Sequence, residues 1–344
     1  MSAQPLSCNH LLLDVRDLAV HFHAREGAIR AVDGVSFSLR RGETLGIVGE
    51  SGCGKSVTSQ AILRIVPKNG HIVSGSIVYS PSCGGEPADL VTLRHNGRRM
   101  RGIRGSKIAM VFQEPMTSFS PVRTIGAQII EVITLHQEIS MKDARGVAIE
   151  MLDRVGMPKP KQLVDAYPFA LSGGMRQRAM IAMALSCRPE LLIADEPTTA
   201  VDVTIQAQIL KLLRDLQGEF GMALLIITHD LSVIASLADT VMVMYLGRDV
   251  EQAPVDDLFH APKHPYTKGL LSSVPRLGRG SAQAITPIRG AVPGPHEMPS
   301  GCTFHPRCDS FIPGVCDAGR PPQMRLHALH TASCYLYSRG PAHE

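Results

Sequence analysis

Residues Gly49 to Ser56, Gly-Glu-Ser-Gly-Cys-Gly-Lys-Ser, have the composition and spacing of a phosphate-binding loop. Its three glycines let the backbone bend so that successive N–H groups point at phosphate oxygens. Lys55 adds a positive charge, and the Ser56 hydroxyl can bind Mg²⁺. The loop therefore predicts a triphosphate site. We expect it to be formed by Gly49, Glu50, Ser51, Gly52, Cys53, Gly54, Lys55, Ser56 and Val57.

The elements around this loop must hold it in place. Thr44–Val48 is an apolar run typical of a buried strand, and Ser56–Val66 has the pattern of a helix. A helix that begins at the loop presents its free N–H groups to an anion. Because Cys53 lies beside this helix start and Lys55, we expect its thiolate to be favoured.

A second apolar strand, Leu191–Ala194, ends in two carboxylates, Asp195 and Glu196. Successive side chains of a strand point to opposite faces, so the two acids have different roles. We expect Asp195 to hold Mg²⁺ through its water shell and Glu196 to accept a proton from the water that attacks the γ-phosphate. Solvated acids at a strand end are the simpler alternative, which the phosphate-binding loop disfavours.

Leu171–Arg178, Leu-Ser-Gly-Gly-Met-Arg-Gln-Arg, resembles the signature of ABC-type ATPases, and the resemblance extends over about residues 11–260. It implies that Ser172, Gly173, Gly174 and Met175, at the start of a helix, contact the γ-phosphate held by a partner subunit. Many members of the family have Gln at the position of Met175, although Met is frequent in the peptide-importer branch. Full activity then requires two such domains that close on ATP.

The same resemblance implies roles for four other residues. Phe22 stacks on adenine, although a core aromatic residue is nearly as good an interpretation. Gln113 contacts Mg²⁺ and the attacking water, and the run Glu114–Pro121 after it contacts a membrane subunit. Asp202 lies in a loop that crosses to the partner, and His229 contacts the γ-phosphate. No residue forms a covalent intermediate.

The resemblance also implies the fold. We expect an α/β ABC-type ATPase with a RecA-like core, an antiparallel β portion and a helical subdomain at about 114–180. The nucleotide-binding domain is assigned to residues 1–260. Beyond it, residues 261–344 contain 12 of the 24 prolines and nine Lys or Arg against four Asp or Glu. This change in composition predicts a small, loop-rich C-terminal extension.

Four cysteines lie in this extension, at Cys302, Cys308, Cys316 and Cys334. Their spacing is not that of a zinc ribbon, but four thiols in so small a region suggest a metal staple or disulfides, and a cytoplasmic location disfavours disulfides. Spacing alone leaves zinc and iron–sulfur equal. The segments His264–Leu271 and Gly301–Cys308 resemble the tail of dipeptide and oligopeptide importer ATPases, which implies a [4Fe–4S] cluster with a structural role.

The whole chain has 344 residues, 44% hydrophobic and 19% charged, enough for a substantial core. No apolar run approaches the ~20 residues of a membrane span, and the N-terminus lacks a secretory signal. We therefore expect a protein at the cytoplasmic face of the membrane, with separate permeases that form the pore. A net charge of +4 does not by itself indicate nucleic acid.

Two functions of different classes follow. The first is the ATP-hydrolysing subunit of a peptide-type ABC importer, paired with a similar ATPase, two permeases and an extracytoplasmic binding protein. The second is a soluble, non-transport ABC ATPase that acts on ribosomes or DNA through the cysteine tail. The His264–Leu271 segment favours the importer, and the tail lacks interleaved aromatic residues for base stacking.

Overall fold

The computed structural model describes residues 11–24, 27–82, 85–113, 118–199, 201–273, 288–294 and 296–338. They form two compact units that alternate along the chain. The first comprises the residues up to Asp14, Ser38–Thr44 and Val78–Ile227, and the second comprises Val15–Phe37, Leu45–Ile77 and the residues from Thr228 onward. The domain boundary near residue 260 remains a prediction from the sequence.

The first unit is organised around three parallel strands, β6 (Ile108–Val111), β7 (Leu191–Asp195) and β8 (Ala223–Thr228). Every residue of the three strands is buried, as expected for strands of a parallel sheet that is covered on both faces. The register places Val111 opposite Ala194 and Asp195 opposite Ile227. The carboxyl ends of β6 and β7 therefore lie side by side.

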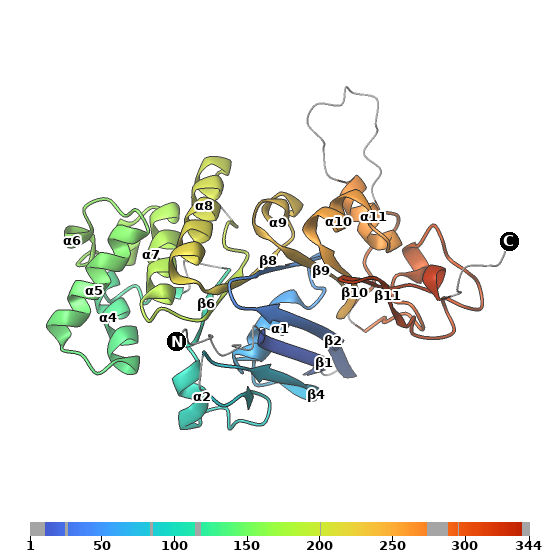
Figure 1. The fold of residues 1–344 in the computed structure, drawn as a ribbon, viewed down its shortest axis with the longest axis horizontal. Coiled ribbons are helices and arrows are strands. Elements are labelled where there is room, and N and C mark those ends of the chain that lie inside the picture. The colour runs from blue at the N-terminus through green and yellow to red at the C-terminus, as the bar shows by residue number, and fades with distance from the viewer. Residues whose placement is uncertain are drawn as a thin grey trace, which may run out of the picture. The chain divides into compact units, whose positions relative to one another are not determined.

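Helices make up most of the remainder of the first unit. They are α2 (Arg98–Ile103), α4 (Ile125–His136), α5 (Met141–Arg154), α6 (Pro160–Leu163), α7 (Gly173–Leu185) and α8 (Val203–Phe220), with a short 3₁₀ turn, η1 (Pro168–Ala170), and the short strand β5 (Ala88–Asp89). Helices α4, α5, α6 and α7 form one group, in which α5 contacts each of the other three (Figure 1). The hydroxyls of Thr124 and Ser140 accept backbone N–H bonds at the starts of α4 and α5.

The second unit contains all or most of each of the remaining strands. They are β1 (Leu11–Ala24), β2 (Gly27–Arg40), β3 (Thr44–Val48), β4 (Gly70–Tyr79), β9 (Thr240–Tyr245), β10 (Arg248–Pro254), β11 (Gln323–His327) and β12 (His330–Ser333). β1 lies between β2 and β4, and the others follow the order β11, β12, β10, β9, β3. β3 and β9 are parallel, with Val48 opposite Val243. Helices α1 (Lys55–Ile62), α9 (Leu231–Leu237), α10 (Val255–His260) and α11 (Pro265–Ser272) complete the unit, together with the 3₁₀ turns η2 (His305–Arg307) and η3 (Tyr335–Tyr337).

Strand β3 has the limits that the sequence predicts, but helix α1 ends at Ile62, four residues before the predicted end at Val66. The backbone of Arg64 is left-handed, with φ +56°. Pro67 also disfavours a helical conformation of Val66. These two effects explain the early end of the helix.

The C-terminal extension has more regular structure than its composition predicts. Strands β11 and β12 form an antiparallel hairpin, and β12 pairs with β10. The Glu251 carboxylate on β10, 2% exposed, accepts hydrogen bonds from His330 Nε2 at 2.8 Å and from the backbone N–H groups of Lys263 and His264 at 2.7 and 2.8 Å. These buried bonds fix the extension to the strands of the second unit.

None of the helices in these described segments is long and apolar enough to span a bilayer.

Candidate functional site

The phosphate-binding loop joins β3 to α1 in the second unit. Two of its glycines are required by their surroundings. A Cβ on Gly49 would lie 2.2 Å from the carbonyl oxygen of Met244, and a Cβ on Gly54 would lie 2.2 Å from that of Ala31. Gly54 also has φ +97°, which side chains of L-residues rarely adopt. The loop is therefore packed closely between β2 and β9.

Lys55, the first residue of α1, is 5% exposed. Its Nζ donates to the carbonyl oxygens of Gly49 at 2.7 Å and Glu50 at 2.9 Å. A buried ammonium group needs such partners, because an unpaired charge is costly away from water. A bound triphosphate presents more negative oxygens to the same group, so Lys55 is placed to bind it.

Cys53 contradicts one expectation. Its side chain is 2% exposed, and burial raises the pKa of the thiol above its usual value. Lys55 lowers this pKa, but its effect is smaller than that of burial. Our expectation of a favoured thiolate is wrong, because the loop removes the sulfur from water.

The catalytic residues predicted for the water-activating step meet in the first unit. Gln113 and Glu196 each lie two positions beyond the paired residues Val111 and Ala194. The Gln113 Nε2 atom donates to Glu196 Oε2 at 2.8 Å, and Thr199 Oγ1 donates to the same oxygen at 2.9 Å. The two donors fix the direction of a carboxylate that is suited to accept a proton from water.

Asp195, at the end of β7, has a different environment from Glu196. Asp195 is 3% exposed, whereas Glu196 is half-buried and has φ +47°, uncommon for a residue with a side chain. This left-handed residue turns the chain away from the strand. The two neighbouring carboxylates are thus separated in exposure, in agreement with two different roles.

Ser172 and its neighbours begin helix α7. The Ser172 Oγ accepts the backbone N–H of Met175 at 3.3 Å, and Ser172 and Gly173 are exposed. The remaining N–H groups at this helix start lack intrahelical acceptors, and the helix dipole favours an anion there. The geometry suits both an ordinary helix cap and a phosphate contact.

Asp202 has an analogous place at the start of α8. Its Oδ1 accepts the backbone N–H of Ile205 at 2.9 Å, and its side chain is exposed. Ala200 and residues 114–117, which belong to the expected crossing loop and glutamine-loop run, lie outside the described residues.

Phe22 and His229 belong to the second unit. Phe22, near the end of β1, is half-buried, and its ring lies against Gly70, where a Cβ would be 2.7 Å from Phe22 Cε1. His229 is exposed directly after β8, and the following Asp230 caps α9 by accepting the N–H of Ser232 at 2.8 Å. The Phe22 side chain therefore packs against Gly70 and remains partly exposed to solvent.

Comparison with known proteins agrees with these elements. The model of the ABC transporter family matches residues 32–199, and that of the oligopeptide/dipeptide transporter C-terminal region matches residues 250–316. A probable peptide ABC transporter ATP-binding protein of Sinorhizobium fredii is 51% identical over 94% of this chain and 95% of its own length. The chain belongs to the ATP-binding subunits of peptide ABC transporters. Within this family, the oligopeptide transport ATP-binding protein AppD of Bacillus subtilis is 47% identical over 97% of this chain and 99% of its own.

Solved structures show the same ABC ATPase fold. The match to a dimeric ATP-binding cassette bound to ADP and Pi covers 71% of this chain and 99% of that chain, with a TM-score of 0.62 and 24% identity. The match to cbiO1 of Clostridium perfringens, part of the ABC transporter complex cbiONQ, covers 74% of this chain and 92% of that chain, with a TM-score of 0.60 and 27% identity. The chain is thus an ABC-type ATPase, and its α/β fold agrees with the prediction.

The four cysteines of this peptide-transporter ATPase lie in the second unit, and all four are free thiols. The backbone N–H of Ile312 donates to Cys316 Sγ at 3.5 Å. Burial and, to a smaller extent, the neighbouring thiols Cys302, Cys334 and Cys316 raise the pKa of Cys308 to about 11. The described residues contain no group of three or more His, Cys, Asp or Glu side chains arranged to hold a metal ion.

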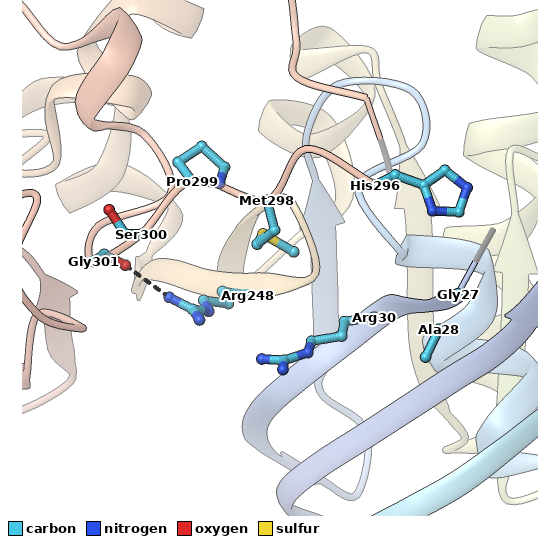
Figure 2. Close-up of a pocket in the computed structure, with 9 residues that line it drawn as sticks. All are labelled: Gly27, Ala28, Arg30, Arg248, His296, Met298, Pro299, Ser300 and Gly301. Carbon is cyan, nitrogen blue, oxygen red and sulfur yellow. Dashed lines mark hydrogen bonds between the residues drawn. The ribbon is translucent and has the colours of Figure 1, made fainter.

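A cavity of about 500 Å³ lies between β2 and the extension (Figure 2). Arg30 and Arg248 bring two guanidinium groups to it, and His296 and Met298 lie on its other side. Arg248 Nη1 donates to the carbonyl oxygen of Gly301 at 3.1 Å, and its guanidinium is paired with Asp33.

Arg307, in the run Gly301–Cys308, is a further residue of this site that the sequence pattern does not predict. It is 8% exposed and forms an ion pair with Glu50 of the phosphate-binding loop, 257 residues away. An arginine between two cysteines carries no signal for this contact.

Proposed function

We propose that this ABC ATPase supplies the energy for import of peptides or related solutes through separate permeases at the cytoplasmic face of the membrane. The match of the C-terminal region to the oligopeptide/dipeptide transporter model carries this proposal, together with relatives named for peptide, oligopeptide and dipeptide transport. The alternative, a non-transport ATPase that acts on ribosomes or DNA, receives no support from these relatives.

For nucleotide binding, we propose the roles predicted from the sequence. Lys55 and the loop N–H groups hold the β- and γ-phosphates, and Phe22 stacks on adenine. Ser56, Gln113 and Asp195 offer a hydroxyl, an amide and a buried carboxylate, the oxygen donors that Mg²⁺ prefers. When bound, Mg²⁺ neutralises charge on the phosphate oxygens.

For hydrolysis, we propose that Glu196 accepts the proton of the attacking water. A bond forms from the water oxygen to the γ-phosphorus, the bond to the β–γ bridging oxygen breaks, and ADP leaves with that electron pair. The Gln113 and Thr199 hydrogen bonds to Glu196 support this role because they orient its carboxylate. His229 contacts the γ-phosphate.

For the partners, we propose a second ATPase subunit, similar but not identical, whose γ-phosphate meets Ser172–Met175 of this chain, with Asp202 in the loop between subunits. Two permeases and an extracytoplasmic binding protein complete the importer. An exposed aromatic pair supports a protein partner for the first unit. Tyr167 and Phe169 are 42% and 72% exposed and stack at 5.4 Å between ring centroids.

Co-expression with the candidate permeases tests this function. We expect the chain to co-purify with them and the complex to hydrolyse ATP faster when its solute-binding protein is loaded with peptide. ATPase stimulation by RNA or DNA, without permease association, would support the alternative and contradict the proposal.

For the four cysteines, we propose a structural [4Fe–4S] cluster rather than zinc. The match of residues 250–316 to the oligopeptide/dipeptide transporter C-terminal region supports this, together with the hydrogen bond from the Ile312 N–H to Cys316 Sγ, since such bonds are typical around metal-bound thiolates.

Anaerobic purification tests the cluster. We expect a brown protein with about four iron and four sulfide per chain, and with loss of colour after Cys316→Ser. Stoichiometric zinc with no visible absorbance would contradict the iron–sulfur assignment.

A further inference from the structure

Arg307 joins the C-terminal extension to the phosphate-binding loop through a two-pronged ion pair. Its Nη1 and Nη2 atoms donate to the two carboxylate oxygens of Glu50 at 2.7 and 3.1 Å. The Arg307 side chain is 6% exposed and that of Glu50 is 26% exposed. Such a planar, bidentate pair fixes orientation as well as distance.

Glu50 is a sensitive point of the loop because Lys55 depends on it. The carbonyl oxygen of Glu50 accepts from Lys55 Nζ at 2.9 Å and from the backbone N–H of Cys53 at 3.3 Å. A shift of the Glu50 peptide would therefore move both the lysine and the turn that cradles phosphate. Because the guanidinium of Arg307 holds the Glu50 side chain, it also restrains this peptide.

A cluster of three buried aromatic rings lies beside Arg307. Tyr245, Tyr266 and Phe304 pack ring against ring, with centroids 4.6 to 5.3 Å apart, and all three are buried. Tyr266 Oη accepts the backbone N–H of Glu50 at 3.0 Å, and Arg307 Nη1 also donates to Tyr245 Oη at 3.3 Å. Both the side chain and the backbone N–H of Glu50 thus contact the same cluster.

A second arginine holds the other end of the same segment. Arg248 donates to the carbonyl oxygen of Gly301 (Figure 2), and the adjacent Gly247 N–H donates to the carbonyl oxygen of Cys53 at 3.0 Å. The segment from Gly301 to Arg307 is therefore connected at both ends to residues that contact the loop.

Packing alone does not explain a buried guanidinium at this place. An apolar side chain would fill the same space without the cost of removing a charge from water. The charge is matched instead to one carboxylate on the nucleotide-binding loop. This argues that the pair specifies the conformation of the loop and does more than attach the extension.

We propose that Arg307 is a positioning residue that holds the phosphate-binding loop in its nucleotide-binding shape, so that the C-terminal extension controls the affinity for ATP. The inference rests on the proposed function, in that the loop is taken to bind the phosphates of ATP. Arg307 itself is expected to act only through Glu50.

The full-length protein with Arg307→Ala, Arg307→Lys or Glu50→Gln tests this. Arg289→Ala is the matched control, because Arg289 also lies in the extension and pairs with an acid, Asp309, but both side chains are more than 70% exposed. The experiment measures the Kd for a fluorescent ATP analogue with Mg²⁺, and the KM and kcat of the assembled complex. It also measures the rate of Cys53 alkylation by iodoacetamide, with the labelled sites mapped by mass spectrometry.

We expect Arg307→Ala to weaken ATP binding about tenfold, to raise KM more than it lowers kcat, and to expose the buried Cys53 to faster alkylation. Arg307→Lys should restore only part of the affinity because it lacks the fork. A double variant, Arg307→Ala with Glu50→Gln, should be no weaker than the single Arg307→Ala variant, since both changes remove one interaction.

The proposal is overturned if Arg307→Ala retains the wild-type Kd and the Cys53 alkylation rate of Arg289→Ala. If Arg307→Ala does not fold, the same comparison with Arg307→Lys and Glu50→Gln decides. If the wild type itself binds no ATP, the proposed function fails, while Cys53 alkylation, which needs no nucleotide, still decides whether Arg307 positions the loop.

Discussion

Glu196→Gln should bind ATP with wild-type affinity but hydrolyse it more slowly by a factor on the order of 10² to 10⁴. Glutamine keeps the size of the side chain and can still accept hydrogen bonds from Gln113 and Thr199, so the local structure is preserved. It cannot take the proton of the attacking water. Single-turnover hydrolysis and equilibrium binding, measured with the assembled complex, separate the two effects.

The matched control is Glu150→Gln on α5, which changes an exposed carboxylate of the same unit. It should leave both binding and turnover unchanged. Turnover near the wild-type rate in Glu196→Gln would remove Glu196 from the mechanism. Loss of ATP binding in that variant would assign Glu196 to binding.

The second large effect concerns stability. His330→Ala should lower the free energy of unfolding by about 3 kcal/mol, because it removes a buried hydrogen-bond donor from the Glu251 carboxylate and leaves a cavity. The two backbone donors, Lys263 and His264, keep part of the carboxylate satisfied. The loss should appear as a lower urea midpoint, with near-native circular dichroism before unfolding.

His327→Ala provides the comparison, since this histidine is exposed on the neighbouring strand β11 and pairs in register with His330. It should change the free energy of unfolding by less than about 0.5 kcal/mol, and so barely move the urea midpoint. Equal midpoints for the two variants would show that the buried bond to Glu251 does not stabilise the extension.

The parts of the fold that the sequence predicts are those fixed by local pattern. The apolar runs at Thr44–Val48 and Leu191–Ala194 form β3 and nearly all of β7, because continuous burial suits strands of a parallel sheet. The helix after Ser172 began where its cap predicts. The loop glycines follow the same logic, since Gly49 and Gly54 have no room for a side chain.

The features that escaped prediction depend on contacts between distant parts of the chain. The β11–β12 hairpin gains its stability by pairing with β10, and its own strands are short and only partly apolar. The Arg307–Glu50 pair joins residues 257 positions apart. Burial of Cys53, which reverses the expected direction of its pKa shift, also arises from tertiary packing of the loop. Local propensity contains none of this information.

The order of residues along the chain also gives no sign that the extension contacts the phosphate-binding loop. Val48 and Val243 are opposite each other in the parallel pair β3–β9, so Glu50 and Tyr245, each two residues further on, emerge at the same edge. Arg307 reaches both. The extension thus belongs to the same compact unit as the phosphate-binding loop.

The most direct test of the account is ATP hydrolysis by the assembled importer with Lys55→Ala, compared with Lys142→Ala, an exposed lysine on α5. Lys55 is the one positive side chain within the phosphate-binding loop itself, and its removal should abolish high-affinity ATP binding and reduce both hydrolysis and solute uptake to background. The control should match the wild type. Undiminished hydrolysis and uptake with Lys55→Ala would contradict the account.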